Sequence, residues 1–497
     1  MDNNYGIPTE AYATPEAAFQ PAEENALQAL PSSSEALRRA RNFFATGRTY
    51  EVNFRLEQLR RLAITISNRE DEILEVLQSE LNKHPAESWL TELAPVLDEL
   101  HEVTTNLTGW LETANVKPRK IQRPAKTTMA LEPIGVVGIF APESFMFSLS
   151  LIPLIDALAA GNCVVLQTSA ALPGLSWLIS DLIHNALTPD YVSVIRRTAS
   201  EQERMESLPF DKFYYSGNRD TAERILTATA RNLTATVLDL NGKSPCIVNS
   251  DADIKVAARR IAYGKLLNAG QSCDAPDYVL VHHSVKNALV KELSTVFNQV
   301  SKNASYYYDS YPRIIDEDNY VRICSLLDGQ VIIQGGAANR ETLQIEPVLL
   351  DEPDPESAVM QTEICGPILP IVSWMDEPQM MSYIRLLPPP RALYLFSADG
   401  DFLDRMSRLI ASDTVTYNDT MQLYASASLP YGGGLPYVSG VIRGREGLRT
   451  FSHTRIIHKR LGRRDRRHRF HPYRRNSLSR LRNLYRYVIK LEKVKMK

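Results

Sequence analysis

Short apolar runs alternate with helix-like segments through the middle of the chain, and this alternation constrains the fold more than any other feature of the sequence. The runs "IGVVGIFAP" from 134, "CVVLQTS" from 163 and "KFYYSGN" from 212 have the length of buried strands, and "LIPLIDALAAG" from 151 has the length of a helix. A second series follows, with "SPCIVNS" from 244 and the helix-like "DIKVAARRIAYGKLL" from 253. Such alternation predicts an α/β fold with parallel sheets and crossover helices.

A helical region is expected before these strands. Ser32 with Glu35 three residues later has the pattern of a capping box. From there to Trp110, apolar residues recur at helical spacing. At 497 residues the chain exceeds what one hydrophobic core usually covers, so more than one domain is predicted.

Composition and motifs exclude several classes of protein. With 44% apolar and 23% charged residues, the chain has the composition of a globular protein. The N-terminus lacks the pattern of a signal peptide, and Pro153, Asp156 and Asn162 interrupt the most apolar segment, which argues against a membrane span. The five cysteines form no CxxC pair, and there is no HExxH. We therefore expect a cytoplasmic protein with no metal site.

The C-terminal tail differs in charge from the rest of the chain. Residues 455–497 contain 17 Lys and Arg against two acidic residues, while residues 1–454 carry a formal net charge of −17. An apolar stripe at helical spacing runs through this tail at Leu478, Leu481, Leu484, Val488 and Leu491. A basic amphipathic helix suits peripheral association with an anionic membrane surface. The alternative is that the stripe packs on the protein body; nucleic acid is an unlikely partner, since no base-reading motif accompanies the charge.

Cys273, in "NAGQSCDAP", is the candidate nucleophile. It lies among small and polar residues just after a predicted helix, where backbone N–H groups can favour a thiolate. The alternative is a small buried residue without chemistry. Ligands of parallel α/β sheets bind beyond the carboxyl ends of the strands. No GxGxxG or GxxxxGK[ST] follows the predicted strands, so neither standard phosphate-binding loop is present.

Residues 238–282, "LDLNGKSPCIVNSDADIKVAARRIAYGKLLNAGQSCDAPDYVLVH", resemble the central block of the aldehyde dehydrogenase superfamily, in which an E-L-G-G-K motif precedes a G-Q-x-C nucleophile. Further matches follow in order across about residues 35–470, among them "EPIGVVGIFAP", "TEICGPILPI", "LPYGGG" and "REGLRTFSHTR". Details such as "APDYVLVH" and "TFSH" are similar to the class 3, fatty-aldehyde-like branch.

The resemblance implies a reaction and roles for residues. Cys273 would attack an aldehyde, Ser144 would occupy the position of the oxyanion donor, and Asp239 that of the base that activates water. The cofactor implied is NAD or NADP, and the residues implied at its site are Gln167, Ser216, Gly217 and Glu363. The substrate implied is an aldehyde, with a lipophilic one favoured by the branch and the basic tail.

Several working positions depart from the family's pattern. Asp239 stands in place of Glu, Ser144 in place of Asn, Gln167 in place of Lys, and Asn241 in place of the first Gly of E-L-G-G-K. Two alternatives to aldehyde oxidation therefore stay open. One is a weakened, pseudoenzyme-like scaffold that binds a partner or a membrane. The other is acyl transfer, in which a thioester that is not hydrolysed passes to another acceptor.

The resemblance also implies a domain organisation and a homodimer. The expected segments are a mobile arm at 1–30, a helical lead-in with the nucleotide-binding domain at 31–238, a catalytic domain at 239–420, a return segment at 421–454 and the basic tail at 455–497. A small bridging element mediates dimerisation in the family.

Overall fold

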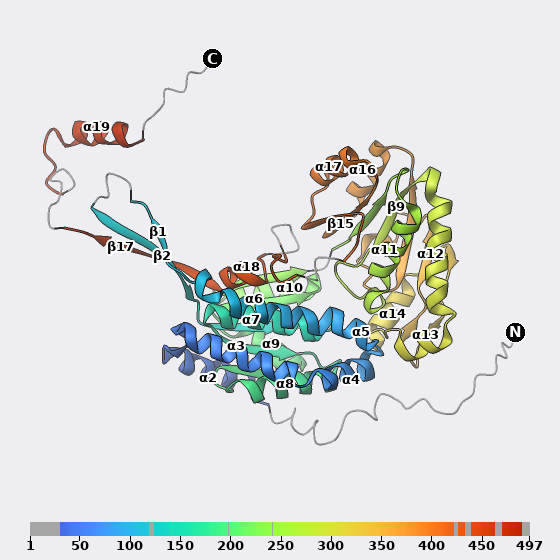
Figure 1. Ribbon diagram of the computed structural model, residues 1–497, viewed down its shortest axis with the longest axis horizontal. Coiled ribbons are helices and arrows are strands. Elements are labelled where there is room, and N and C mark those ends of the chain that lie inside the picture. The colour runs from blue at the N-terminus through green and yellow to red at the C-terminus, as the bar shows by residue number, and fades with distance from the viewer. Residues whose placement is uncertain are drawn as a thin grey trace, which may run out of the picture.

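The computed structural model describes residues 30–118, 124–140, 142–196, 198–240, 242–421, 426–432, 439–462 and 470–489. In this part of the chain two α/β units lie side by side, and a smaller sheet projects from the body of the protein (Figure 1). The predicted α/β class is therefore confirmed. The arm at 1–30, except for Leu30, and Asn241 lie outside the described residues.

The described chain begins with helices, as predicted. Ser32 caps α2 (Ser33–Ala45), and its Oγ accepts a hydrogen bond from the backbone N–H of Glu35 at 3.4 Å. The helices that follow are α3 (Val52–Ser67), α4 (Glu70–Leu81), α5 (Pro85–Ser88) and, after one π-helical turn, α6 (Ala94–Trp110). Their buried leucines, such as Leu59 and Leu100, belong to the same hydrophobic core as the first sheet.

The first unit contains a five-stranded parallel sheet with the order β5-β4-β3-β6-β7. Its strands are β3 (Val136–Phe140), β4 (Cys163–Thr168), β5 (Val192–Arg196), β6 (Lys212–Gly217) and β7 (Ala235–Leu240). The connecting helices are α7 (Met146–Ala160), α8 (Pro173–Ala186), α9 (Ala199–Ser207) and α10 (Arg219–Ala230). After β3 the chain adds β4 and β5 on one side of it, and then crosses to add β6 and β7 on the other side. This reversal of the strand order places a ligand crevice at the carboxyl ends of the strands around β3.

One helix of this unit begins earlier than its sequence predicts. α7 starts at Met146, and Pro153 therefore lies inside it rather than near its start. All fifteen residues of α7 are buried, so packing on every side stabilises the helix despite the backbone hydrogen bond that proline cannot donate.

The second unit contains a seven-stranded sheet with the order β10-β13-β14-β9-β8-β15-β16, in which only β10 is antiparallel to its neighbour. Its strands are β8 (Pro245–Val248), β9 (Tyr278–His282), β10 (Ile332–Gln334), β13 (Val348–Asp351), β14 (Ile368–Trp374), β15 (Ala392–Phe396) and β16 (Thr414–Tyr417). The helices are α11 (Ile254–Leu266), α12 (Lys286–Ser301), α13 (Ala304–Ser310), α14 (Glu317–Ser325), α15 (Ala358–Gln361), α16 (Glu377–Leu386) and α17 (Gly400–Leu409). A two-stranded ribbon, β11 (Ala338–Asn339) and β12 (Gln344–Ile345), accompanies them.

The projecting element is an antiparallel sheet of β1 (Ala114–Val116), β2 (Ala125–Pro133) and β17 (Ser452–Arg460). β17 pairs with β2 from Ser452 opposite Pro133 to Arg460 opposite Ala125. Between the second unit and β17, α18 (Gly444–Thr450) packs against α7.

The C-terminal tail contains one described helix, α19 (Ser477–Ile489), and Leu478 on it is 59% exposed. Among the described helices, none is both long enough and apolar enough to cross a membrane.

Candidate active site

Cys273 lies on a tightly folded loop between α11 and β9. Asn268 and Ala269 both adopt positive φ angles near 50°, which side chains rarely tolerate. Gly270 follows at φ 74°, and a Cβ there would lie 2.4 Å from the carbonyl oxygen of Gly366. The loop therefore packs directly against the "TEICG" segment that contains Glu363. Cys273 is partly buried there.

Tyr431 is the polar neighbour of the cysteine. The Sγ of Cys273 lies 3.4 Å from the hydroxyl of Tyr431. Two backbone hydrogen bonds with Ile442 hold Tyr431 in place. Burial raises the pKa of the Cys273 thiol above its ordinary value, and the Arg391 guanidinium opposes this rise. The charge on Arg391 therefore matters to the reactivity of the sulfur.

Asp239, the predicted base, lies one residue before the end of β7 in the first sheet and is held by an ion pair. Its Oδ1 lies 2.6 Å from Nη2 of Arg391, which precedes β15 of the second sheet. Its Oδ2 accepts hydrogen bonds from Ser216 at 3.2 Å and Tyr214 at 3.5 Å. Contacts at both oxygens therefore orient the Asp239 carboxylate.

Lys243 ties together the loops that surround the site. Its Nζ donates hydrogen bonds to Asp277 Oδ2 at 2.5 Å and to the carbonyl oxygens of Val359 and Thr362 at 2.9 Å each. The other oxygen of Asp277 accepts from the backbone N–H of Ile364 at 3.2 Å. Lys243 and Asp277 are almost fully buried. One buried cation thereby fixes the segment on both sides of Glu363 relative to the loop of Cys273.

Two of the predicted cofactor residues have buried polar atoms that lack a partner among the described residues. Both side-chain atoms of Gln167, which is fully buried at the end of β4, are unpaired, and so are both carboxylate oxygens of Glu363. Burial raises the pKa of Glu363 well above its usual range, since desolvation disfavours the charged form. Unpaired buried polar atoms are costly unless a ligand completes their hydrogen bonds, so these side chains fit a bound group rich in hydroxyls.

The geometry at the ends of the strands agrees with this fit. Gly217 ends β6 at φ 150°, and a Cβ there would lie 2.4 Å from the hydroxyl of Tyr215, so this close turn requires glycine. Ser216 precedes it and contacts Asp239. At the carboxyl ends of β4 and β5 lies a cavity of about 580 Å³. The residues that line it are Glu143, Ser169, Ala170, Ala171, Arg196, Thr198, Ala199 and Gln202.

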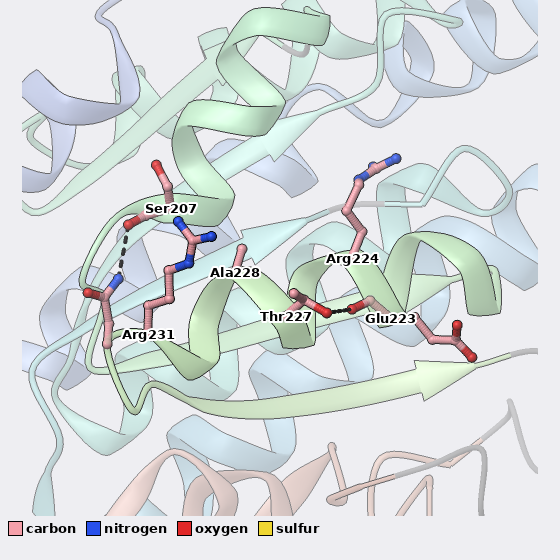
Figure 2. Close-up of a pocket in the computed structure, with 7 residues that line it drawn as sticks. Ser207, Glu223, Arg224, Thr227, Ala228 and Arg231 are labelled. Atoms are coloured by element: carbon pink, nitrogen blue, oxygen red, sulfur yellow. Dashed lines mark hydrogen bonds between the residues drawn. The ribbon is translucent and has the colours of Figure 1, made fainter.

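Other features are less closely tied to the site. Ser144 is half-buried in the turn between β3 and α7, and its role as oxyanion donor stays a prediction. The pocket in Figure 2 lies along α10, where Arg224 pairs with Glu206 at 3.1 Å and Asn232 donates to the carbonyl of Ser207 at 2.9 Å. None of the predicted site residues lines this pocket.

Arg391, Tyr431 and Asp274 are neighbours of the nucleophile that the sequence analysis did not identify. Arg391 opens the apolar run "ALYLFS", and Asp274 directly follows Cys273. The sequence offered two signals: Arg391 is a charge next to an apolar run, and Asp274 is a charge next to the candidate nucleophile. Charged residues are rarely buried unless they are paired, so each of these two residues could have been expected to have a charged partner. The sequence separation between these residues concealed the pairing.

The two parallel-sheet units bring together a half-buried cysteine, two carboxylates and buried polar groups that lack partners among the described residues. This is the architecture of a dehydrogenase with a cysteine nucleophile. The model of the aldehyde dehydrogenase family matches residues 17–457. The chain therefore belongs to the aldehyde dehydrogenase family, as the resemblance implied.

Individual relatives place the chain within the family. It is 36% identical to 4,4'-diaponeurosporen-aldehyde dehydrogenase of Staphylococcus aureus, over 83% of this chain and 90% of that protein. It is 34% identical to the dimeric NADP-preferring aldehyde dehydrogenase of Mus musculus, over 86% of this chain and 94% of that protein. Among solved structures, the substrate-bound state of Staphylococcus aureus AldH superposes with a TM-score of 0.87 at 33% identity and covers 91% of this chain and 99% of that one. The chain is also 34% identical to aldehyde dehydrogenase family 3 member A2 of Pongo abelii, over 84% of this chain and 86% of that protein, which confirms the predicted class 3 branch.

Proposed function

We propose that this protein oxidises a lipophilic aldehyde to a carboxylic acid with NAD or NADP, with Cys273 as the nucleophile. The observation that carries the proposal is the partly buried Cys273, whose sulfur lies 3.4 Å from the Tyr431 hydroxyl to which Arg391, the ion-pair partner of Asp239, also donates. Family membership supports the reaction class. The scaffold alternative finds no support among the relatives, which carry the names of enzymes.

The residues present account for each part of the reaction. Cys273 loses its proton to water, and its sulfur attacks the carbonyl carbon, which gives a thiohemiacetal oxyanion. NAD or NADP, when bound, would supply the acceptor for the hydride that leaves this carbon. The resulting thioester is hydrolysed by water that Asp239 orients and deprotonates, and the thiol and a carboxylic acid are released. Gln167, Ser216, Gly217 and Glu363 would hold the cofactor, and Ser144 would donate to the oxyanion.

The substrate class and the partners are proposed from the relatives. A lipophilic aldehyde is favoured because the relative at 36% identity is named for 4,4'-diaponeurosporen-aldehyde. A homodimer is favoured by the relative named as dimeric and by Ile456 and Ile457, which are 66% and 46% exposed on the projecting sheet. Sedimentation velocity should show two chains per particle, and a monomer would contradict the proposal.

The basic tail is proposed to attract an anionic membrane surface. Co-sedimentation with anionic vesicles but not with neutral vesicles would show this.

The test is reduction of NAD and NADP by the full-length protein with aldehydes of medium and long chain. We expect steady turnover that depends on the aldehyde. A burst of one equivalent without turnover would contradict hydrolysis by Asp239 and favour acyl transfer instead. If the native protein is silent and Asp239→Glu restores turnover, the aspartate is too short to act as the base. Silence from both proteins, together with no cofactor binding by calorimetry, would reject the proposal.

A further inference from the structure

A single guanidinium lies at the centre of the polar groups around the nucleophile. Arg391 is 2% exposed, and its Nε donates to Asp274 Oδ1 at 2.8 Å, its Nη1 to the carbonyl of Leu240 at 2.6 Å and its Nη2 to the hydroxyl of Tyr431 at 2.5 Å. The same Nη2 forms the ion pair with Asp239. A Cβ at Gly242 would lie 2.7 Å from the Cβ of Arg391, so glycine at 242 leaves the space that this arginine occupies. Three nitrogens of one planar guanidinium are thus engaged at once, which the single amino group of a lysine would not reproduce.

The hydroxyl of Tyr431 has one hydrogen, and two acceptors for it lie within reach among the described residues. Arg391 donates to its oxygen, so its own hydrogen points either to Asp274 Oδ2 at 2.8 Å or to the sulfur of Cys273 at 3.4 Å. A neutral thiol is a weak acceptor, whereas a thiolate competes strongly for the hydrogen. A rotation of one hydroxyl hydrogen would therefore stabilise the ionised cysteine without movement of heavy atoms.

The charges near the sulfur make the sign of each contribution clear. The titratable groups that interact with it or contact it are Arg391, Asp274, Asp239, Glu363, Tyr214, Tyr394 and Tyr431. Each negative carboxylate disfavours a second negative charge on the thiol, and the only cation in this set, Arg391, favours it. Loss of Arg391 would leave carboxylates around the sulfur with no cation among these groups to offset them.

We propose that Arg391 is a positioning residue which offsets the charges of Asp239 and Asp274 and orients Tyr431 so that the tyrosine hydroxyl donates to the Cys273 thiolate. On ionisation the thiol proton passes to water, and the hydroxyl hydrogen turns from Asp274 to the sulfur. This inference rests on the proposed function in assigning Cys273 as the nucleophile. It adds a device that controls the ionisation of that residue.

The experiment is the rate of alkylation of Cys273 by iodoacetamide as a function of pH, in full-length protein without aldehyde or nucleotide. Because Cys324 and Cys365 are also partly exposed, the modified peptide is quantified by mass spectrometry. Arg391→Met and Tyr431→Phe should both move the midpoint of the profile to higher pH, and a rise of one pH unit gives about tenfold slower labelling at neutral pH. Asp274→Asn should move it to lower pH, since a charge and a competing acceptor are lost. Arg391→Lys should restore part of the shift, because it keeps the cation but not the fork of donors.

Matched controls separate this role from a merely structural one. Arg55→Met removes another buried arginine, which donates to the carbonyl oxygens of Thr49 and Ala159, and Tyr191→Phe removes another buried hydroxyl. Both should leave the profile of Cys273 unchanged. If Arg391→Met does not fold, Tyr431→Phe, which removes only one oxygen, carries the test.

The outcomes distinguish this proposal from the proposed function. Unchanged midpoints in Tyr431→Phe and Asp274→Asn would overturn the role of the Arg391–Tyr431 pair, even if the native protein oxidises aldehydes. Opposite shifts in these two variants would support it, even if the native protein does not oxidise aldehydes. Alkylation measures only the thiolate, so a failure of cofactor binding does not affect the result.

Discussion

Replacement of Cys273 by alanine is expected to abolish aldehyde-dependent reduction of the nicotinamide. The reaction needs a covalent bond between the sulfur and the carbonyl carbon, and removal of a covalent nucleophile costs on the order of 10⁶-fold in kcat in other enzymes. The side chain is small and half-buried, so its loss leaves a minor cavity and the fold should persist. Steady-state rates with saturating aldehyde, together with calorimetric affinity for the cofactor, measure both halves of the prediction.

Cys246→Ala is the matched control for this experiment. Cys246 is fully buried in β8, so substrate cannot reach its sulfur, whereas Cys273 is only partly buried. Its replacement should leave the rate within about twofold of the native rate, provided that the variant folds. Turnover that survives in Cys273→Ala would show that another group carries the chemistry and would reject the nucleophile assignment.

Lys243→Met is expected to destabilise the protein severely. The substitution leaves Asp277 buried without its cation and removes the donor to two carbonyl oxygens. Loss of one partner of a buried ion pair costs about 3–5 kcal/mol, a large fraction of the stability of a typical domain. We expect a markedly lower midpoint in thermal unfolding and a loss of cofactor affinity, since Lys243 fixes the segment around Glu363.

Lys286→Met provides the comparison for an exposed pair. Lys286 bonds to Asp351 and Glu352 at 2.6 Å each, but the two acceptors are 42% exposed. Exposed pairs contribute about 0–1 kcal/mol, so this variant should unfold close to the native midpoint. Equal effects of the two substitutions would mean that burial of Lys243 has no special role.

The fold was largely predictable from local patterns, because strands and helices of α/β proteins are built from short apolar runs that are contiguous in sequence. The Ser32 cap, the strands that contain Val137, Val164 and Ile247, and the helix that contains Ile261 are all where the sequence predicts them. The start of α7 was not, since an interior proline usually marks a helix end and complete burial offsets its cost here.

The candidate site was predictable only in part. The motifs of the resemblance gave Cys273, Asp239 and Glu363 roles that stay predictions, and the structure packs the loop of Cys273 against the segment that contains Glu363. The partners of these residues could not be assigned, because Arg391 and Tyr431 are more than 100 residues from Cys273 and the "LPYGGG" match that contains Tyr431 implies no role for it. Pairing of buried charges depends on how the two sheets meet, which no local pattern reports.

The ion pair between Asp239 and Arg391 also joins the two sheets, since Asp239 lies in β7 and Arg391 directly precedes β15. A hinge motion that separated the sheets at this point would leave a buried carboxylate and a buried guanidinium without each other, which is costly in a low local dielectric. The pair therefore acts as a clasp that opposes opening of the protein between its two sheets.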